Sequence, residues 1–448
     1  MLCNLFERID KGTEKVDQLL DNGEIESTPI LDYKFSATLG FGIGFFEKLK
    51  ITSDNCPKKL RRMPSHVGLL DPSPYTLAQT DLLIQLCSTS DFVNQWVFEN
   101  ALHSSSNSSL QKGAPDVVTA INEWGIVIDI HAGFQRIDGR NLMGFNDGIS
   151  NPDRLVNDVI WITEQESSRF KDGTYMVFQK IEHDLDEWRK LSREEEERWV
   201  GRSKGTGLLL GTLPKEQDLQ LSSDLHSSDT SIRKRAMAKW KSLLDEQKNP
   251  EYRFYDGKDP RFKDIRVECP VWSHVRKANP REVDGVPKKL IFRRGYLYNE
   301  GGTNRKFSSG LLFICFQRDI AEGFEYIKKK WLNNKNFPIP EARQNFTKEE
   351  LASRQNRGRF TLRQLERFGV SQKQTLGMDP VKFREAVDEA KKEDAQNTGR
   401  EGLCGPSELG IKPKGDYLAT VSLGGGYYFV PPIYKKRISE MGEQFFNR

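Results

Sequence analysis

The sequence lacks the features of a disulfide-stabilised, zinc-binding or membrane-spanning protein. Its 448 residues include six cysteines, which show no CxxC pair and no regular spacing, so neither a disulfide framework nor a zinc site is predicted. No apolar stretch reaches the roughly 18 residues that indicate a membrane helix. The start of the chain carries neither a secretion signal nor a twin arginine. We therefore expect a cytoplasmic protein without a membrane partner. Export is the alternative if the natural N-terminus differs from the one in this sequence.

An excess of charge of one sign is also absent. Lys and Arg number 68 against 64 for Asp and Glu, which gives a net charge of +4. The basic runs are short and scattered, as is typical of a solvated surface. A balance this close gives no electrostatic reason to expect nucleic acid as a partner.

The length and the order of predicted elements indicate two domains. A chain of 448 residues exceeds the roughly 100–200 residues of an ordinary domain. Apolar periodicity in the first third predicts the order strand, helix, strand, strand, helix, strand at residues 1–8, 13–20, 34–40, 81–87, 92–102 and 125–132. The same order returns at residues 174–181, 184–200, 289–293, 310–317, 320–331 and 417–430. This is the order of a ferredoxin-like βαββαβ unit.

The sequence thus predicts an α+β fold with two ferredoxin-like halves built on antiparallel sheets. We place the first half at residues 1–150 and the second at residues 151–448. Two polar insertions near residues 202–266 and 333–414 enlarge the second half. Both are rich in Lys, Glu, Gln and Asp, which favours surface helices and long loops.

Two separated motifs carry the chemical information. The first is GFNDG at residues 144–148; the second is SHVRKANPR, which contains His274 and is followed by IFRRG at residues 291–295. Taken alone, each has an ordinary interpretation, because NDG is a turn former and a lone histidine is more often a satisfied polar residue than a ligand. Together and in this order they resemble the dye-decolorizing (DyP-type) haem peroxidase family. The resemblance runs from about residue 1 to about residue 435.

The resemblance implies a haem b pocket in the C-terminal half, with His274 as the iron ligand. It also implies that Asp147 is the acid beside bound peroxide. Gly144 and Gly148 bracket that aspartate, and glycine lets a backbone approach a ligand closely. Asp319 is one candidate for the acid that hydrogen-bonds the iron-ligating imidazole.

The resemblance assigns a distal guanidinium to Arg293 or to its neighbour Arg294. Adjacent side chains on a strand point to opposite faces, so only one of them can reach the pocket. The family's apolar-apolar-Arg pattern favours Arg293. Leu311 and Phe313 share one face of the strand at 310–317, and the resemblance implies that they line the distal pocket; a plain core role explains them equally well.

The implied activity is reduction of hydrogen peroxide with oxidation of dyes, phenols or other small aromatic reductants. Cleavage of the peroxide bond requires a proton to be moved and negative charge to be stabilised, roles that fall to Asp147 and Arg293. Two other functions stay open: a haem- or iron-handling protein with little turnover, and a ferredoxin-like interaction module without enzymatic activity. A homo-oligomer is compatible with each of them.

Overall fold

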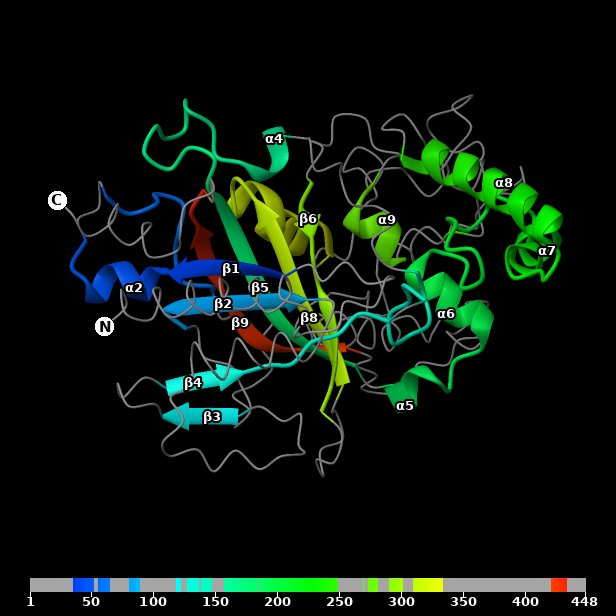
Figure 1. Cartoon of the computed structure of the whole chain (residues 1–448), viewed down its shortest axis with the longest axis horizontal. Helices are drawn as coiled ribbons and strands as arrows, with labels where there is room; N and C mark the ends of the chain where they lie inside the picture. Colours follow the sequence, from blue (N-terminus) through cyan, green and yellow to red (C-terminus); the bar gives the residue numbers. More distant parts are fainter. Residues whose placement is uncertain are drawn as a thin grey trace, which may run out of the picture.

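The computed structural model describes residues 35–51, 55–64, 80–88, 118–121, 127–136, 138–146, 157–183, 185–248, 269, 273–280, 290–300, 309–332 and 420–432. Within these ranges the chain is built around a curled seven-stranded antiparallel sheet (Figure 1). The strand order is β2 (Leu82–Ser88), β1 (Phe35–Gly42), β9 (Thr420–Val430), β5 (Thr174–His183), β8 (Ser309–Gln317) and β6 (Phe292–Arg293), with β7 (Tyr296–Asn299) also paired to β8. A separate hairpin joins β3 (Val118–Ile121) to β4 (Val127–Ile130).

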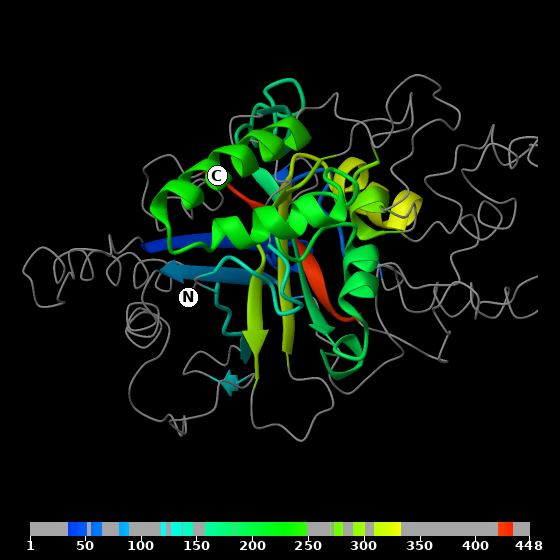
Figure 2. The same ribbon diagram turned by 90° about the vertical axis from the view of Figure 1, so that its right-hand side faces the viewer.

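The helices are mostly short. They are α2 (Ile43–Lys48), α4 (Asn157–Ile160), α5 (Leu185–Trp188), α6 (Arg193–Val200), α7 (Lys215–Leu225), α8 (Thr230–Lys248), α9 (His274–Ala278) and the π-helical segments η3 (Ala321–Glu325) and η4 (Ile327–Leu332). In the turned view of Figure 2, η3 and η4 (yellow) lie beside the upper part of the sheet. No helix in the described ranges is both long enough and apolar enough to cross a membrane.

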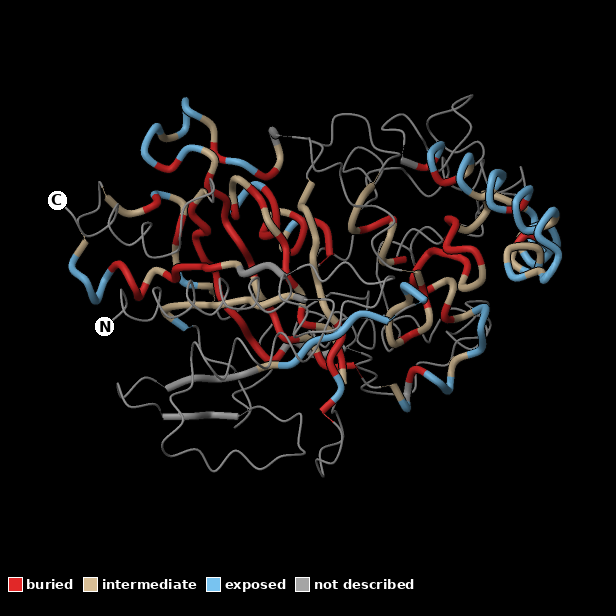
Figure 3. Tube along the Cα trace, in the orientation of Figure 1, coloured by how far each residue is buried: buried red, intermediate tan, exposed pale blue. Residues whose placement is uncertain are grey.

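The two faces of the sheet bury different side chains. Across the β5–β8 pair, Val177 lies opposite Cys315 and Phe178 lies opposite Ile314. Val177 and Cys315 belong to the larger apolar core, which Phe324 of η3 joins. Phe178 and Ile314 belong to a second cluster on the other side. We call the side of Val177 and Cys315 the helical face. Figure 3 shows that the central strands of the sheet are largely buried.

Most of the predicted strands are confirmed. Strands are present at the segments predicted at 34–40, 81–87, 125–132, 174–181, 310–317 and 417–430, with ends shifted by a few residues. The strand predicted at 289–293 is reduced to Phe292–Arg293, and β3 and β7 were not predicted. The predicted elements at 1–8, 13–20 and 92–102, and the insertion at 333–414, lie outside the described residues.

The prediction of a single helix at 184–200 is wrong in one respect, because the segment forms two helices, α5 and α6. The Ser192 hydroxyl accepts a hydrogen bond from the Glu195 backbone amide, and the Glu195 carboxylate accepts one from the Ser192 amide. This capping box starts a new helix. The insertion at 202–266 contains α7 and α8, which lie largely at the surface, as predicted (Figure 3).

The α+β class is confirmed, while the division into two halves stays a prediction. Strands β1 and β2 come from the predicted first half, yet they continue the sheet formed by the second half. The connection is the pairing of Phe41 in β1 with Phe429 in β9.

Candidate functional site

The register of β6 against β8 places Arg293 on the helical face of the sheet. Arg293 lies directly opposite Cys315, and directly opposed residues in an antiparallel pair share a face. The neighbouring Arg294 points to the other side, where its guanidinium carbon lies 5.0 Å from the centre of the Phe292 ring. Burial raises the pKa of the Cys315 thiol, and the positive charge of Arg293 acts in the opposite direction.

Leu311 and Phe313 lie on the same face as Arg293, because they alternate with Cys315 along β8. Both side chains are half-buried, whereas Leu312 and Ile314 on the opposite face are buried. The Phe313 ring lies 6.0 Å from the ring of Phe324 in η3. The pair therefore presents accessible apolar surface on the side of the sheet where η3 packs.

His274 is the first residue of α9 and is half-buried. The next residue, Val275, packs against an apolar cluster formed by Met143, Phe145, Trp188, Trp199 and Val200. At the other end of α9, Ala278 packs against a cluster on η4. Contacts at both ends fix the position of the short helix, which has too few turns to be stable alone.

Ile291 connects α9 to the strand that carries Arg293. It packs against the same η4 cluster as Ala278. The His274 helix and the Arg293 strand are therefore both held by η4.

Asp147 and Gly148 lie outside the described residues, but the loop that leads to them is described. Gly144 has a φ of +86°, the left-handed conformation that glycine adopts most readily. The Arg140 guanidinium donates hydrogen bonds to the carbonyl oxygens of Gly144 at 2.7 Å and Lys204 at 2.5 Å. The Phe145 side chain is 1% exposed. The loop is therefore held in place immediately before Asp147, both by the hydrogen bonds of Arg140 and by the buried side chain of Phe145.

Phe145 also relates the two motifs to each other. It belongs to the same apolar cluster as Val275. Phe145 stands two residues before Asp147, and Val275 stands one residue after His274. The segments that lead to the predicted acid and to the predicted iron ligand therefore pack on one cluster.

The Asp319 carboxylate is engaged at both oxygens. Oδ1 accepts hydrogen bonds from the backbone amides of Ala321 at 2.9 Å and Glu322 at 3.2 Å, which caps the start of η3. Oδ2 forms an ion pair with Lys59 Nζ at 2.9 Å. Both oxygens of the carboxylate that the sequence suggested as a partner of His274 are therefore already occupied by other groups.

Sequence reasoning did not single out His183, the last residue of β5. Its side chain is 8% exposed, and burial lowers the pKa of the imidazole to about 4. It stands in no motif, so only the register of the sheet reveals which face it occupies.

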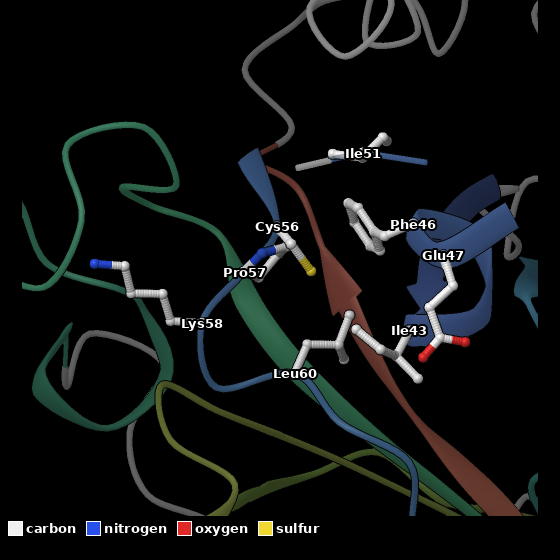
Figure 4. A pocket seen from close by; sticks show the side chains of 8 residues that line it. All are labelled: Ile43, Phe46, Glu47, Ile51, Cys56, Pro57, Lys58 and Leu60. Atoms are coloured by element: carbon white, nitrogen blue, oxygen red, sulfur yellow. The ribbon is translucent and has the colours of Figure 1, made fainter. Parts of the chain in front are cut away.

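A groove of about 610 Å³ lies elsewhere, beside α2 (Figure 4). Its lining residues are Ile43, Phe46, Glu47, Ile51, Cys56, Pro57, Lys58 and Leu60. None of them belongs to the motifs described above, and several also contribute to the main core. We therefore do not place the candidate site there.

The fold resembles a solved DyP-type peroxidase structure. The protein from Cellulomonas bogoriensis superposes with a TM-score of 0.51 at 18% identity, covering 98% of this chain and 89% of that chain. In sequence, the family descriptions "Dyp-type peroxidase, N-terminal" and "Dyp-type peroxidase, C-terminal" match residues 1–108 and 138–349. The chain belongs to the Dyp-type peroxidase family.

Curated relatives carry the name deferrochelatase. The protein from Shigella flexneri serotype 5b (strain 8401) is 29% identical over 308 residues, covering 65% of this chain and 60% of that protein. The protein from Escherichia coli (strain K12) is 28% identical over 307 residues, covering 65% of this chain and 59% of that protein. The chain therefore matches about 60% of the length of these relatives.

Proposed function

We propose that this chain is a haem-dependent peroxidase that reduces hydrogen peroxide and oxidises dyes, phenols or other small aromatic reductants in one-electron steps. The observation that carries the proposal is the register of β6 and β8. It sets a guanidinium, Arg293, on the same face as the accessible apolar pair Leu311 and Phe313. A peroxide pocket requires this combination of a fixed positive charge and a water-excluding wall.

The residues present fit a haem. Leu311 and Phe313 offer apolar surface for a flat porphyrin, and they lie on the side of the sheet where η3 packs. His274 offers an imidazole on a helix held by η4, and histidine is a common axial ligand of haem iron. The chain has no CxxC sequence, the start of the motif that attaches c-type haem covalently. We therefore propose haem b, held without a covalent bond to the protein.

Each residue has a separate role in the proposed reaction. His274 would hold the iron, and haem, when bound, would supply the redox chemistry that cleaves the peroxide bond. Asp147 takes the proton from the inner peroxide oxygen and returns it to the outer one. Arg293 stabilises the negative charge that develops on the departing oxygen. Leu311 and Phe313 keep water away from these groups.

One experiment tests the proposal directly. Protein reconstituted with haem is mixed with hydrogen peroxide and a phenol or an anionic dye, and both peroxide consumption and reductant oxidation are followed. We expect a Soret band from the bound haem, and two equivalents of reductant oxidised for each peroxide consumed. Failure of the parent protein to bind haem, or binding without turnover above that of free haem, would refute the proposal.

A second candidate function is haem or iron handling with little peroxide turnover. The name deferrochelatase, carried by the relatives that are 28–29% identical, favours this alternative. Anaerobic incubation of the haem-loaded protein, chemically reduced beforehand, with a ferrous chelator separates the two functions. Release of iron with recovery of intact porphyrin, together with negligible peroxide turnover, would favour handling; retained iron with rapid turnover favours the peroxidase.

We further propose that residues 1–150 and 151–448 form two ferredoxin-like halves. The sheet order β9-β5-β8-β6 supports this for the second half, because it places the fourth strand beside the first and the third beside the second. Expression of residues 151–448 alone tests the division. A cooperative unfolding transition is expected, and a chain without one would contradict a separate second half.

A further inference from the structure

His183 lies in the same row of side chains as Leu311 and Phe313. Along the β5–β8 pair, Gln179 lies opposite Phe313 and Ile181 lies opposite Leu311. Because alternate residues of a strand share a face, His183 continues this row two residues beyond Ile181. It thus lies on the helical face, at the end of the sheet remote from Arg293.

The imidazole is buried, and one of its two nitrogen atoms lacks a hydrogen-bond partner among the described residues. Its Nδ1 has no hydrogen-bond partner within the described part of the chain, although the side chain is only 8% exposed. Burial lowers the pKa of the ring to about 4, so at neutral pH the imidazole is uncharged, with one N–H donor and one acceptor nitrogen. A buried polar atom without a partner costs about 1–3 kcal/mol. An ordinary core position would avoid that cost with an apolar side chain.

The register places His183 at the rim of the proposed pocket and not at its centre. The midpoint between Leu311 and Phe313 is level with Lys180, three residues before His183. At about 3.3 Å per residue, His183 lies about 10 Å along the strand from that midpoint. A bond between a metal and the nitrogen of a histidine ligand is only about 2 Å long. His183 therefore cannot bind a metal centred over the Leu311–Phe313 pair.

We propose that Nδ1 of His183 donates a hydrogen bond to a carboxylate of bound haem. This inference rests on the proposed haem site. The carboxylates are the strongest hydrogen-bond acceptors that haem carries, and they lie at the edge of the porphyrin. A neutral imidazole N–H satisfies such an acceptor in an apolar setting without adding a buried charge. Arg293 lies at the other end of the row and stays available to interact with the peroxide.

A cycle that combines a variant with a modified cofactor tests the hydrogen bond. Haem and its dimethyl ester, in which both carboxylates are masked, are loaded separately into the parent and into His183→Leu. The rate of haem transfer to excess apomyoglobin is then measured for each. In the parent, esterification should speed haem loss by about tenfold, as expected for a lost hydrogen bond to a charged group. In His183→Leu both cofactors should leave at the faster rate, so that their ratio approaches one.

Two further variants make the result decisive. His131→Leu serves as the matched control, because the ring of His131 packs 6.2 Å from Phe178 on the opposite face; it should keep the parental ratio. His183→Asn keeps a donor near the position of Nδ1 and should restore most of the parental ratio. This variant also provides the test if the leucine variant folds poorly.

The outcomes separate this inference from the proposed function. An unchanged ratio in both His183 variants overturns the hydrogen bond and leaves His183 as a core residue. A parent protein that binds no haem sinks the proposed function itself. The melting temperature of the apoprotein gives an independent readout: it should not fall in His183→Leu, because the unpartnered Nδ1 is removed.

Discussion

Arg293 and Cys315 face each other across β6 and β8, on the helical face of the sheet. One step further along the chain, Arg294 stacks on Phe292 on the other face. Two adjacent arginines of the same chemistry therefore occupy different environments. This provides a matched pair for testing which one acts on peroxide.

Replacement of Arg293 with leucine should slow the reaction with peroxide by about 10²–10³-fold, the effect typical of a lost electrostatic donor. Arg294→Leu should change the same rate by less than about twofold. Both variants should retain haem. Stopped-flow mixing with peroxide, without a reductant, measures the step through the change in the Soret band. Equal effects of the two substitutions would show that the register does not select the functional arginine.

Removal of the His274 imidazole should weaken haem binding while the fold survives, because the apolar wall formed by Leu311 and Phe313 stays in place. We expect His274→Ala to retain less haem after gel filtration and to show an altered ferric spectrum. His226→Ala is the control, since His226 is exposed at the C-terminal end of α7 and its ring Nδ1 lies 2.8 Å from the Ser222 carbonyl oxygen. Parental haem content and spectrum in His274→Ala would exclude it as the ligand.

Asp147 should set the acid limb of the peroxide step. Only an ionised carboxylate accepts a proton, and the reference pKa of aspartate is about 3.9. The parent rate should therefore hold down to about pH 4 and fall below it, whereas a histidine base would fail near 6.5. Asp147→Asn should be slower by about 10²–10⁴-fold and should lack this limb. Profiles of the same shape in the two proteins would contradict the assignment.

Substitution of Gly144 should disturb the loop that leads to Asp147. An alanine there must adopt a φ of +86°, and its Cβ would lie 2.6 Å from the Lys204 side chain. Gly139→Ala is a matched control, because Gly139 has a φ of +67° and no atom of the described residues lies within 4 Å of a Cβ placed there. Each variant should lose about 1–2 kcal/mol of stability. Only Gly144→Ala should also slow the peroxide step; an equal rate in both variants would contradict the role of the loop.

Burial of neutral His183 makes the stability of the apoprotein depend on pH. The folded-state pKa is about 4, below the unfolded value of about 6.5, so the unfolded chain binds the proton more readily between these values. Stability should therefore be complete above about pH 6.5 and decline by about 3 kcal/mol as the pH falls to 4. His183→Leu should lose this component of the decline in urea unfolding experiments. An identical pH profile in parent and variant would contradict the burial of an uncharged ring.

The sequence predicted those parts of the fold that local patterns encode. Alternating apolar residues identified β5 and β8, and the motif order identified the family. The shortness of β6 hid its pairing, because two residues carry no periodicity. The split between α5 and α6 was readable in principle from Ser192 and Glu195, since S-x-x-E is a known helix start.

The site was predictable only in part, for a different reason. The choice between Arg293 and Arg294 depends on which strand residue lies opposite Cys315, and a register between strands is set by long-range packing. His183 illustrates the same limit more strongly. Nothing near it in the sequence marks it, and its relation to Leu311 exists only once β5 and β8 are paired.

The central position of β9 has a consequence for biosynthesis. Its pairing partners are β1, from the start of the chain, and β5, so most of the protein has left the ribosome before this gap in the sheet can be filled. Until then both neighbours expose unpaired edges, which invite association with other chains. Closure through such distant pairing is intrinsically slow. A nascent chain is therefore most in need of protection by chaperones during the interval before residue 430 emerges.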